Sequence, residues 1–337
     1  MKNGEKTYNS IDLCKIIMAI CVVAIHTHPL ENCSNKVILN IYESIVNCAV
    51  PFFFLASGYL LAIKLRCPYD SLENIEVIKK YLLKIVKMYV VWTIIYSPIG
   101  LWFYWQSGHN VIKCFLLYLR GFLLIGENYN SNILWYLLST IYALIFVCML
   151  LKIRVSLENT VKLGVVIILC GFGVDTLVAY ESNMPAIMET FCLIIEKTIV
   201  NGRILRGFFF IPCGMLLAYR KQLVKGYREI LVITFIGNCI VDNLFFSNIL
   251  ILICSVSFFS IVVQINLNDA KVFPIMRELS TVVYLIHLYV WMLYYTMIYG
   301  KSMYGMDCFI MTVLVSLVLG GGYIFVKEKF KVTCIQK

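Results

Sequence analysis

The sequence predicts an all-α fold, a polytopic helical bundle embedded in a membrane. Of its 337 residues, 61% are hydrophobic and 14% are charged, whereas about 25% of the residues of a soluble domain are charged. The mean hydropathy is +0.84. The apolar residues fall in blocks of about 20, the length of helix that crosses a bilayer. A β-barrel is not expected, because its strands alternate apolar and polar residues.

About ten of these blocks are long enough to span a membrane, and a shorter apolar stretch at 111–126 carries Lys113 and Arg120. We expect the short stretch to be a re-entrant or interfacial segment rather than a span. No soluble domain, linker or internal repeat is evident, so one integral membrane domain over 1–337 is the simplest interpretation. The expected spans are 11–29, 38–63, 86–105, 132–151, 161–179, 204–219, 229–246, 248–266, 280–299 and 307–326.

The net charge of +10 does not indicate a nucleic-acid partner, because the lysines and arginines cluster between the apolar blocks. Clusters of this kind are typical of the loops of membrane proteins. If 111–126 does not cross, every basic loop falls on the side that holds the N-terminus. The positive-inside rule then predicts about ten spans with both termini in the cytoplasm.

The first span carries three ionisable residues at helical spacing. Lys15 and His26 are 11 residues apart, about three turns and about 16 Å along a helix, and Asp12 lies one turn before Lys15. All three therefore share one face, and such residues usually face a bundle interior or a water-filled cavity. Equally, Asp12 and Lys15 are explained as interfacial residues and His26 as a residue at a helix end.

Later spans contain further polar candidates. Ser57 and Gly58 allow the close approach of another helix, and His287, one turn after Tyr284, needs a hydrogen-bond partner inside its span. Trp135 opens the 132–151 span, where an aromatic belt is its simplest explanation. Arg203 and Arg206 lie at the start of another span, where anion binding and interfacial anchoring are both open.

In this order, these residues resemble the motifs of the membrane-bound acyltransferase 3 family, and the resemblance covers nearly the whole chain. That family has an acid, an arginine and, eleven residues later, a histidine in its first helix, followed by a Phe-rich stretch with Ser-Gly-Phe, a Leu-Trp pair and a Tyr-Leu-x-His. The matching residues are Asp12, Lys15, His26, Phe52–Phe54, Ser57, Gly58, Tyr59, Leu134, Trp135, Tyr284, Leu285 and His287.

Besides Tyr59 in place of phenylalanine, the sequence departs from the family pattern at three points. Lys15 replaces the arginine, Ile133 stands where a histidine often precedes Leu-Trp, and no acid follows Trp135. This divergent pattern is similar to the membrane domains of vancomycin-resistance serine racemases. No racemase domain follows in this sequence, so we do not expect racemisation.

The resemblance implies a bacterial plasma-membrane enzyme. It would transfer an acyl group, acetyl being the expected one, from cytoplasmic acyl-CoA to a hydroxyl of a cell-surface glycan or lipid-linked saccharide. A hydroxyl is a poor nucleophile at neutral pH, and a histidine can take its proton. No metal and no permanently bound cofactor are expected. The expected roles are catalysis for His26, Asp12 and His287, CoA binding for Lys15, Lys84 and Lys87, and substrate binding for Ser57, Trp135, Arg203, Arg206 and Tyr284.

Two other functions remain open at the level of sequence. The polar residues of the first span and Arg206 could line a path for a small polar solute such as an amino acid, although no repeat typical of transporters is visible. The loss of the arginine at Lys15 is compatible with a non-catalytic accessory protein that binds glycan. Lys84 and Lys87 also satisfy the positive-inside rule without binding CoA.

Overall fold

The computed structural model describes residues 8–67, 71–129, 131–180, 186–199, 201–220, 226–299 and 303–335, which form helices and connecting turns without a strand. The chain divides into two compact units, each described here by itself. The first unit comprises Met1–Phe53, Tyr227–Ile240 and Ile253–Lys337, and the second comprises Phe54–Gly226 and Val241–Leu252. The expectation of a single domain over 1–337 stays a prediction.

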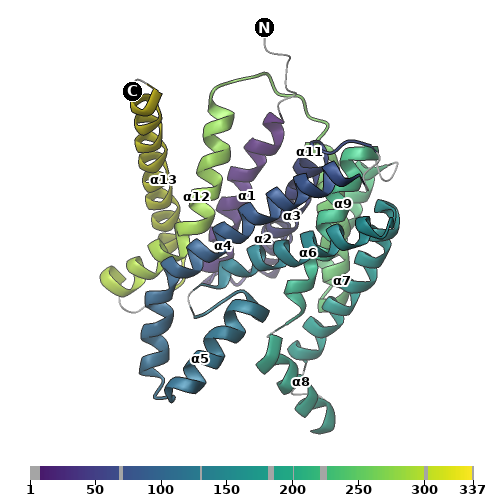
Figure 1. The fold of residues 1–337 in the computed structure, drawn as a ribbon. Helices are drawn as coiled ribbons and strands as arrows, with labels where there is room; N and C mark the ends of the chain where they lie inside the picture. Colours follow the sequence, from purple (N-terminus) through teal and green to yellow (C-terminus); the bar gives the residue numbers. More distant parts are fainter. Residues whose placement is uncertain are drawn as a thin grey trace. The chain divides into compact units, whose positions relative to one another are not determined.

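Thirteen α-helices and several short helical turns make up the described part of the chain (Figure 1). The helices are α1 (Asn9–Thr27), α2 (Lys36–Val46), α3 (Ala49–Ala62), α4 (Leu72–Gln106), α5 (Val111–Arg120), α6 (Trp135–Lys152), α7 (Leu157–Ala179), α8 (Ala186–Ile199), α9 (Gly207–Arg220), α10 (Tyr227–Ile240), α11 (Leu244–Val262), α12 (Val272–Leu293) and α13 (Met306–Ile335). The turns are η1 (Gly121–Ile125), η2 (Asn132–Leu134), η4 (Gly202–Arg206) and η5 (Tyr294–Tyr299).

The all-α membrane bundle predicted from the apolar blocks is confirmed. Within the described residues, nine helical segments are long and apolar enough to cross a membrane. One predicted span, 38–63, is interrupted at Asn47 and Cys48, which separate α2 from α3. The short stretch 111–126 forms α5 and η1 and is not one of the nine candidate spans.

Side-chain caps fix where several helices begin. A cap accepts a hydrogen bond from a backbone N–H of the first turn, which has no partner within the helix. The Asn110 amide oxygen accepts from Lys113 N at 2.8 Å, and this cap begins α5 beyond the break that follows α4. Asn35, Ser71 and Ser156 cap α2, α4 and α7 in the same way.

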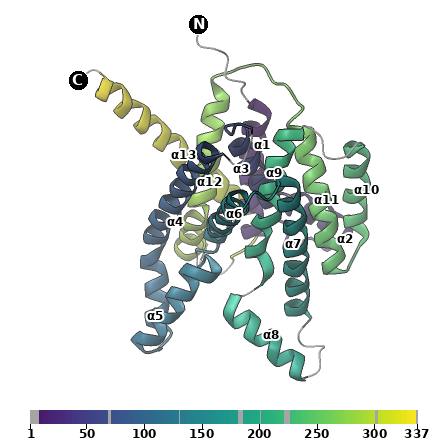
Figure 2. The ribbon, with the colours of Figure 1, turned by 45° about the vertical axis from the view of Figure 1, so that its right-hand side comes forward.

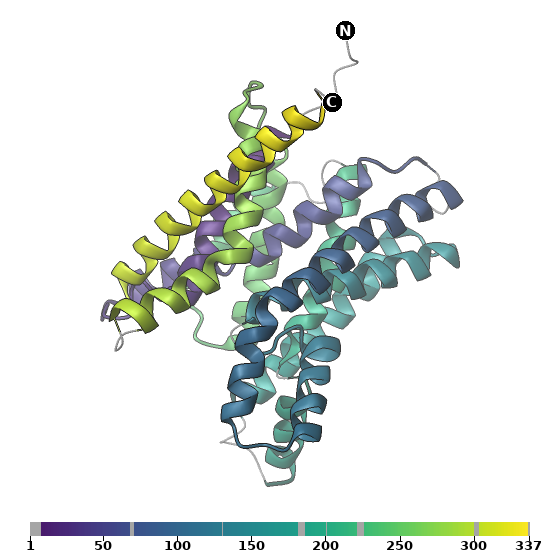
Figure 3. The ribbon, with the colours of Figure 1, turned by 60° about the vertical axis from the view of Figure 1, so that its left-hand side comes forward.

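The core of the first unit lies between α1, α12 and α13, which run side by side (Figure 3). Ala19 and Val23 of α1 and Val283 of α12 are fully buried there. In contrast, α13 leaves Leu314, Val318 and Phe325 exposed on its outer side. Exposed large apolar side chains along a whole helix fit contact with hydrocarbon rather than water.

Helices α1 and α12 run in the same direction. Near their starts, Asp12 is paired with Arg277, and near their ends His26 lies beside His287. Two membrane-spanning helices of one chain are parallel only if an odd number of crossings separates them. The candidate spans between α1 and α12 number six in the described residues, so one further crossing is required.

The further crossing is α10, which was expected at 229–246 and ends earlier, at Ile240. At its start, the Tyr227 hydroxyl bonds to Gln264 at 2.5 Å. Gln264 lies close in sequence to Leu267, whose carbonyl accepts a bond from Asn9 at the start of α1. The start of α10 therefore lies at the same end of the first unit as the start of α1.

At the other end of α10, the Cys239 carbonyl accepts a hydrogen bond from Asn40 of α2 at 2.7 Å. The same part of α2 contacts the last turns of α1, because the Tyr42 hydroxyl donates to Ala24 O at 2.8 Å. Helix α10, which lies beside α11 and α2 in Figure 2, thus runs from the end of the unit where α1 starts towards the end where α1 finishes. Its crossing supports the ten spans that the sequence predicts.

In the second unit, α3 and α9 approach at reciprocal glycines. A Cβ atom on Gly58 would collide with the backbone oxygen of Ile211, and one on Gly214 would collide with that of Leu55. Small residues allow backbones in membranes to approach this closely. The close approach predicted from Ser57 and Gly58 is therefore confirmed, and α9 is its partner.

Candidate active site

At its starting end, α1 holds a buried carboxylate between cations. The Asp12 side chain is 7% exposed, and Arg277 Nε of α12 donates to its Oδ2 at 3.0 Å. Lys15, one turn further along α1, also acts on the Asp12 carboxylate electrostatically. Asp12 thus lies between two cations at this end of the helix pair, called here the Asp12 end.

Asn9 fixes the chain that leads into α12. Its side-chain nitrogen donates to the Asp269 carboxylate at 2.8 Å and to Leu267 O at 3.2 Å. Asn9 is itself buried. The segment before α12 is thereby tied to the first turn of α1, which sets the register that brings Arg277 to Asp12.

At the other end of the same two helices lie two imidazoles. The ring centroids of His26 and His287 are 5.3 Å apart, with the ring planes at 35°. His26 is half-buried at the last turn of α1, whereas His287 is fully buried. Asp12 and His26 are 14 residues apart, so about 21 Å of helix separates the Asp12 end from this His26 end.

The hydrogen bonding of His287 fixes which of its ring nitrogens is basic. Nδ1 lies 3.1 Å from the carbonyl oxygen of Val283, one turn back. A carbonyl can only accept, so Nδ1 carries the hydrogen and Nε2 carries the lone pair. Nε2 is buried and has no hydrogen-bond partner among the described residues. The Val283 carbonyl is therefore the hydrogen-bond partner that the sequence analysis expected for His287.

Aromatic rings close the site around His287. The Tyr284 ring lies 6.2 Å from it, and Phe53 packs on Tyr284 at 5.7 Å. Apolar walls exclude water and strengthen electrostatic interactions inside a site. The arrangement can therefore hold a neutral imidazole, ready to accept a proton, at the His26 end.

In the second unit, Arg203 is held by two partners. Its guanidinium forms an ion pair with Glu127 and lies over the Trp135 ring, 5.4 Å from the centroid. Trp135 is the first residue of α6 and is half-buried. A cation over an aromatic face is stabilised by the ring quadrupole. An anionic ligand at Arg203 would thus share the guanidinium with Glu127.

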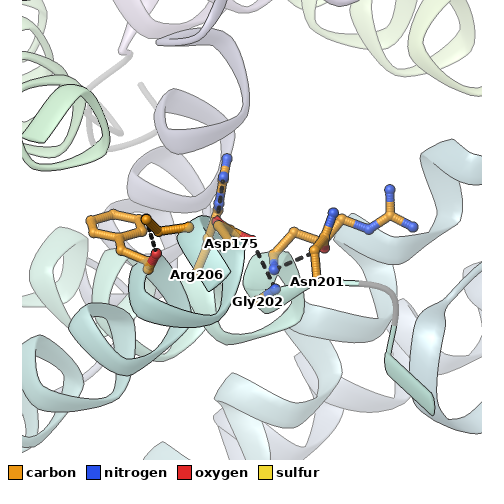
Figure 4. Close-up of polar contacts among 7 residues, drawn as sticks. Asp175, Asn201, Gly202 and Arg206 are labelled. Atoms are coloured by element: carbon orange, nitrogen blue, oxygen red, sulfur yellow. Dashed lines mark hydrogen bonds and ion pairs between the residues drawn. The ribbon is translucent and has the colours of Figure 1, made fainter. Parts of the chain in front are cut away.

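Arg206 is anchored to α7. Its Nη2 donates to Asp175 Oδ2 at 3.2 Å, and the other oxygen of Asp175 accepts from Gly202 N at 2.8 Å. Figure 4 shows Asp175 between Arg206 and Gly202, with Asn201 beside them. The Asn201 side chain accepts from Arg203 N at 3.1 Å and starts η4. These contacts orient both arginines at the start of α9.

Three other predicted residues lie in the second unit. The Ser57 hydroxyl is 3.0 Å from that of Tyr136. Lys84 and Lys87 are exposed on α4. The first unit thus contains Asp12, Lys15, His26, Tyr284 and His287, and the second contains Ser57, Lys84, Lys87, Trp135, Arg203 and Arg206.

Sequence reasoning missed Arg277, Asn9 and Glu127. Arg277 was counted only as one of the basic residues between spans, and 265 positions separate it from Asp12. Glu127 follows the short stretch at 111–126, to which no site was assigned. Within the described part of the chain, His, Cys, Asp and Glu nowhere form a group that could hold a metal ion.

The sequence matches a known protein family over most of its length. A family model described as an acyltransferase domain matches residues 8–326. The chain therefore belongs to this acyltransferase family, as its motifs indicated.

Relatives with curated names are racemases of enterococci. An amino-acid racemase of Enterococcus faecalis is 27% identical over 342 residues, covering 96% of this chain and 47% of that protein. A serine/alanine racemase of Enterococcus gallinarum is 29% identical over 218 residues, covering 64% of this chain and 29% of that protein. The chain thus spans about half the length, or less, of these relatives. No solved structure matches it.

Proposed function

We propose that this membrane acyltransferase moves an acyl group, acetyl in the simplest case, from cytoplasmic acyl-CoA to a hydroxyl of a cell-surface glycan or of its lipid-linked precursor. The family supports acyl transfer. The observation that carries the mechanism is the pairing of His26 with His287 at the opposite end of α1 and α12 from the cations around Asp12.

In the proposed reaction, His26 acts as the general base. The acceptor hydroxyl attacks the thioester carbonyl while its proton passes to His26, and the C–S bond then breaks. The CoA sulfur leaves and takes the proton back, so products are the ester and the free thiol. General bases of this kind contribute about 10²–10⁴-fold to the rate.

His287 supports this step from α12. Its Nδ1–H bond to Val283 keeps the lone pair on Nε2, so the ring can accept a proton or orient His26. Complete burial makes a charged imidazolium costly there, so His287 carries the proton only during transfer. We assign His287 to proton handling and Asp12 to holding the Arg277 guanidinium.

The orientation follows from the distribution of charge. We place the Asp12 end in the cytoplasm of a bacterium, together with both termini, because the basic segments of the chain then face inward. Lys15 would hold the donor there, and CoA binding by Lys84 and Lys87 stays a prediction from the sequence. Ser57, Trp135, Arg203, Arg206 and Tyr284 remain our candidates for the acceptor.

The test uses membranes that contain the full chain and labelled acetyl-CoA. We expect label to enter a glycan or lipid-linked saccharide fraction with wild type and not with His26→Ala at equal protein level. Label that enters these fractions equally with both proteins would contradict the assignment of His26. No label with either protein would contradict the proposed acceptor class.

Transport is the second candidate, favoured by the names of the relatives, an amino-acid racemase and a serine/alanine racemase. A membrane part that accompanies amino-acid chemistry could move amino acids. Uptake of labelled serine or alanine by proteoliposomes, without any turnover of acetyl-CoA, would favour this candidate over acyl transfer.

A further inference from the structure

The ion pair between Asp12 and Arg277 is unequally exposed. The Asp12 side chain is 7% exposed and the Arg277 side chain 55%. Asp12 takes the Nε hydrogen of Arg277. A guanidinium has five N–H groups in a planar fork, so the edge formed by its two Nη atoms stays available at the surface.

Two acidic residues near Arg277 in sequence accept hydrogen bonds from other residues. Asp269 accepts from Asn9 at 2.8 Å. Glu278, next to Arg277 in sequence, accepts from Lys327 Nζ at 2.6 Å. The Asp12 carboxylate contacts Arg277 at 3.0 Å and also faces Lys15.

We propose that Arg277 binds a phosphate group, and that this phosphate belongs to the nucleotide part of the acyl donor. Asp12 holds the guanidinium through Nε, and the two Nη atoms bind two phosphate oxygens in the bidentate geometry that arginine favours. Lys15 adds a point charge beside it. The inference rests on the proposed function, because it assigns the donor site of that reaction.

The position of Arg277 fits an acyl-CoA molecule. Its phosphates and its thioester lie at opposite ends of a long pantetheine arm, and Arg277 and His26 lie at opposite ends of the α1–α12 pair. At the end of the pair where α1 carries Lys15, α12 carries the guanidinium of Arg277. An ammonium cannot form the bidentate contact, so Arg277 is the specificity-determining residue for phosphate.

The experiment measures binding of acetyl-CoA and of acetyl-pantetheine, which has no phosphate, to the purified full chain. Arg277→Gln should weaken acetyl-CoA binding about tenfold or more, since hydrogen bonds to charged groups contribute about 1.5–3 kcal/mol. Arg277→Lys, which keeps the charge, should lose less. Lys329→Gln removes an exposed cation of α13 and should change binding less than about twofold. Binding of acetyl-pantetheine should be the same in all four proteins.

Three results would overturn the assignment. Equal acetyl-CoA affinity of wild type and Arg277→Gln would show that Arg277 does not contact the donor, and equal loss for acetyl-pantetheine would show a structural role. A phosphate could also come from a lipid headgroup. If Arg277→Gln lowers the retention of phosphatidylglycerol in nanodiscs and leaves acetyl-CoA binding unchanged, the site binds a lipid headgroup instead. If wild type binds neither acetyl compound, the proposed function itself fails.

Discussion

His26 and His287 lie with their ring centroids 5.3 Å apart, although they come from the first helix and from α12. The same two helices are joined at their starts by the ion pair between Asp12 and Arg277. Two contacts near opposite ends fix the register of a parallel helix pair. This pair therefore organises the reaction that we propose, with phosphate recognition at one end and proton transfer at the other.

The buried imidazole of His287 leads to a prediction in which activity and stability diverge. His287→Phe removes the Nε2 atom, which has no hydrogen-bond partner among the described residues, and fills the site with an apolar ring. The variant also loses the Nδ1 bond to Val283, which costs about 0.5–1.5 kcal/mol and offsets the gain from removing Nε2. We expect release of CoA thiol to fall about 100-fold or more, with a thermal midpoint close to that of wild type.

Thiol release and thermal unfolding of the same detergent preparation check this prediction. Lys329→Gln is a suitable control, because it changes an exposed residue of α13 outside the proposed sites. A His287→Phe protein with unchanged turnover would exclude a role for this residue in proton handling.

The approach of α3 to α9 predicts a sharp difference between two glycines. Gly58→Ala places a methyl group against the Ile211 backbone and should lower the free energy of unfolding of the second unit by about 1–3 kcal/mol. Gly173→Ala has open space around its Cβ atom and should be neutral or stabilising by up to about 1 kcal/mol. Thermal unfolding in detergent compares the two. Equal midpoints would mean that α3 and α9 do not approach as described.

The anchoring of Arg206 predicts a measurable coupling with Asp175. Asp175→Ala removes an acceptor from both Gly202 and Arg206, so we expect a loss of about 1–3 kcal/mol in stability. Asp175→Asn keeps an oxygen for the Gly202 N–H and should cost less. A double-mutant cycle with Arg206→Gln should give a coupling of at least about 0.5 kcal/mol. Additive effects would argue against the ion pair.

Trp135 and Arg203 allow a test of acceptor binding. Trp135→Ala removes the ring beneath the Arg203 guanidinium, and we expect the KM for the acceptor to rise about tenfold while the KM for acetyl-CoA is unchanged. Trp135→Phe keeps an aromatic face and should lie between wild type and Trp135→Ala. A change confined to the KM for acetyl-CoA would instead place the donor near Trp135.

The sequence predicted the spans well because each is an apolar block, but it placed their ends less well. Helix α4 begins at Leu72, well before the expected span 86–105. Its first part is charged on one side, while Ile75, Ile78 and Ile85 are buried at helical spacing. Mean hydropathy over a window does not detect such an amphipathic extension.

The candidate site was predictable only along single helices. Helical spacing placed Asp12, Lys15 and His26 on one face, and α1 is continuous through all three. Their partners on α12 could not be found in this way, because contacts between helices depend on packing and register. The contacts of Arg277 with Asp12 and of Val283 with His287 were therefore identified only in the structure. The same is true of the pairing of His26 with His287.

The substrate role of the two arginines stays a prediction. Sequence alone left anion binding and anchoring open for Arg203 and Arg206, and the structure gives each a carboxylate partner, Glu127 and Asp175. Neither partner carries a motif that could have indicated it. Both acids lie far from the arginines along the chain, and local patterns do not report such distant pairs.

The central claim is that His26 acts as a base in acyl transfer from acetyl-CoA. The most direct measurement is the rate of CoA thiol release by purified wild type and by His26→Gln, which keeps hydrogen-bonding capacity but cannot take up the proton. We predict a fall of about 100-fold or more with binding of acetyl-CoA unchanged. Equal rates for the two proteins would contradict this account.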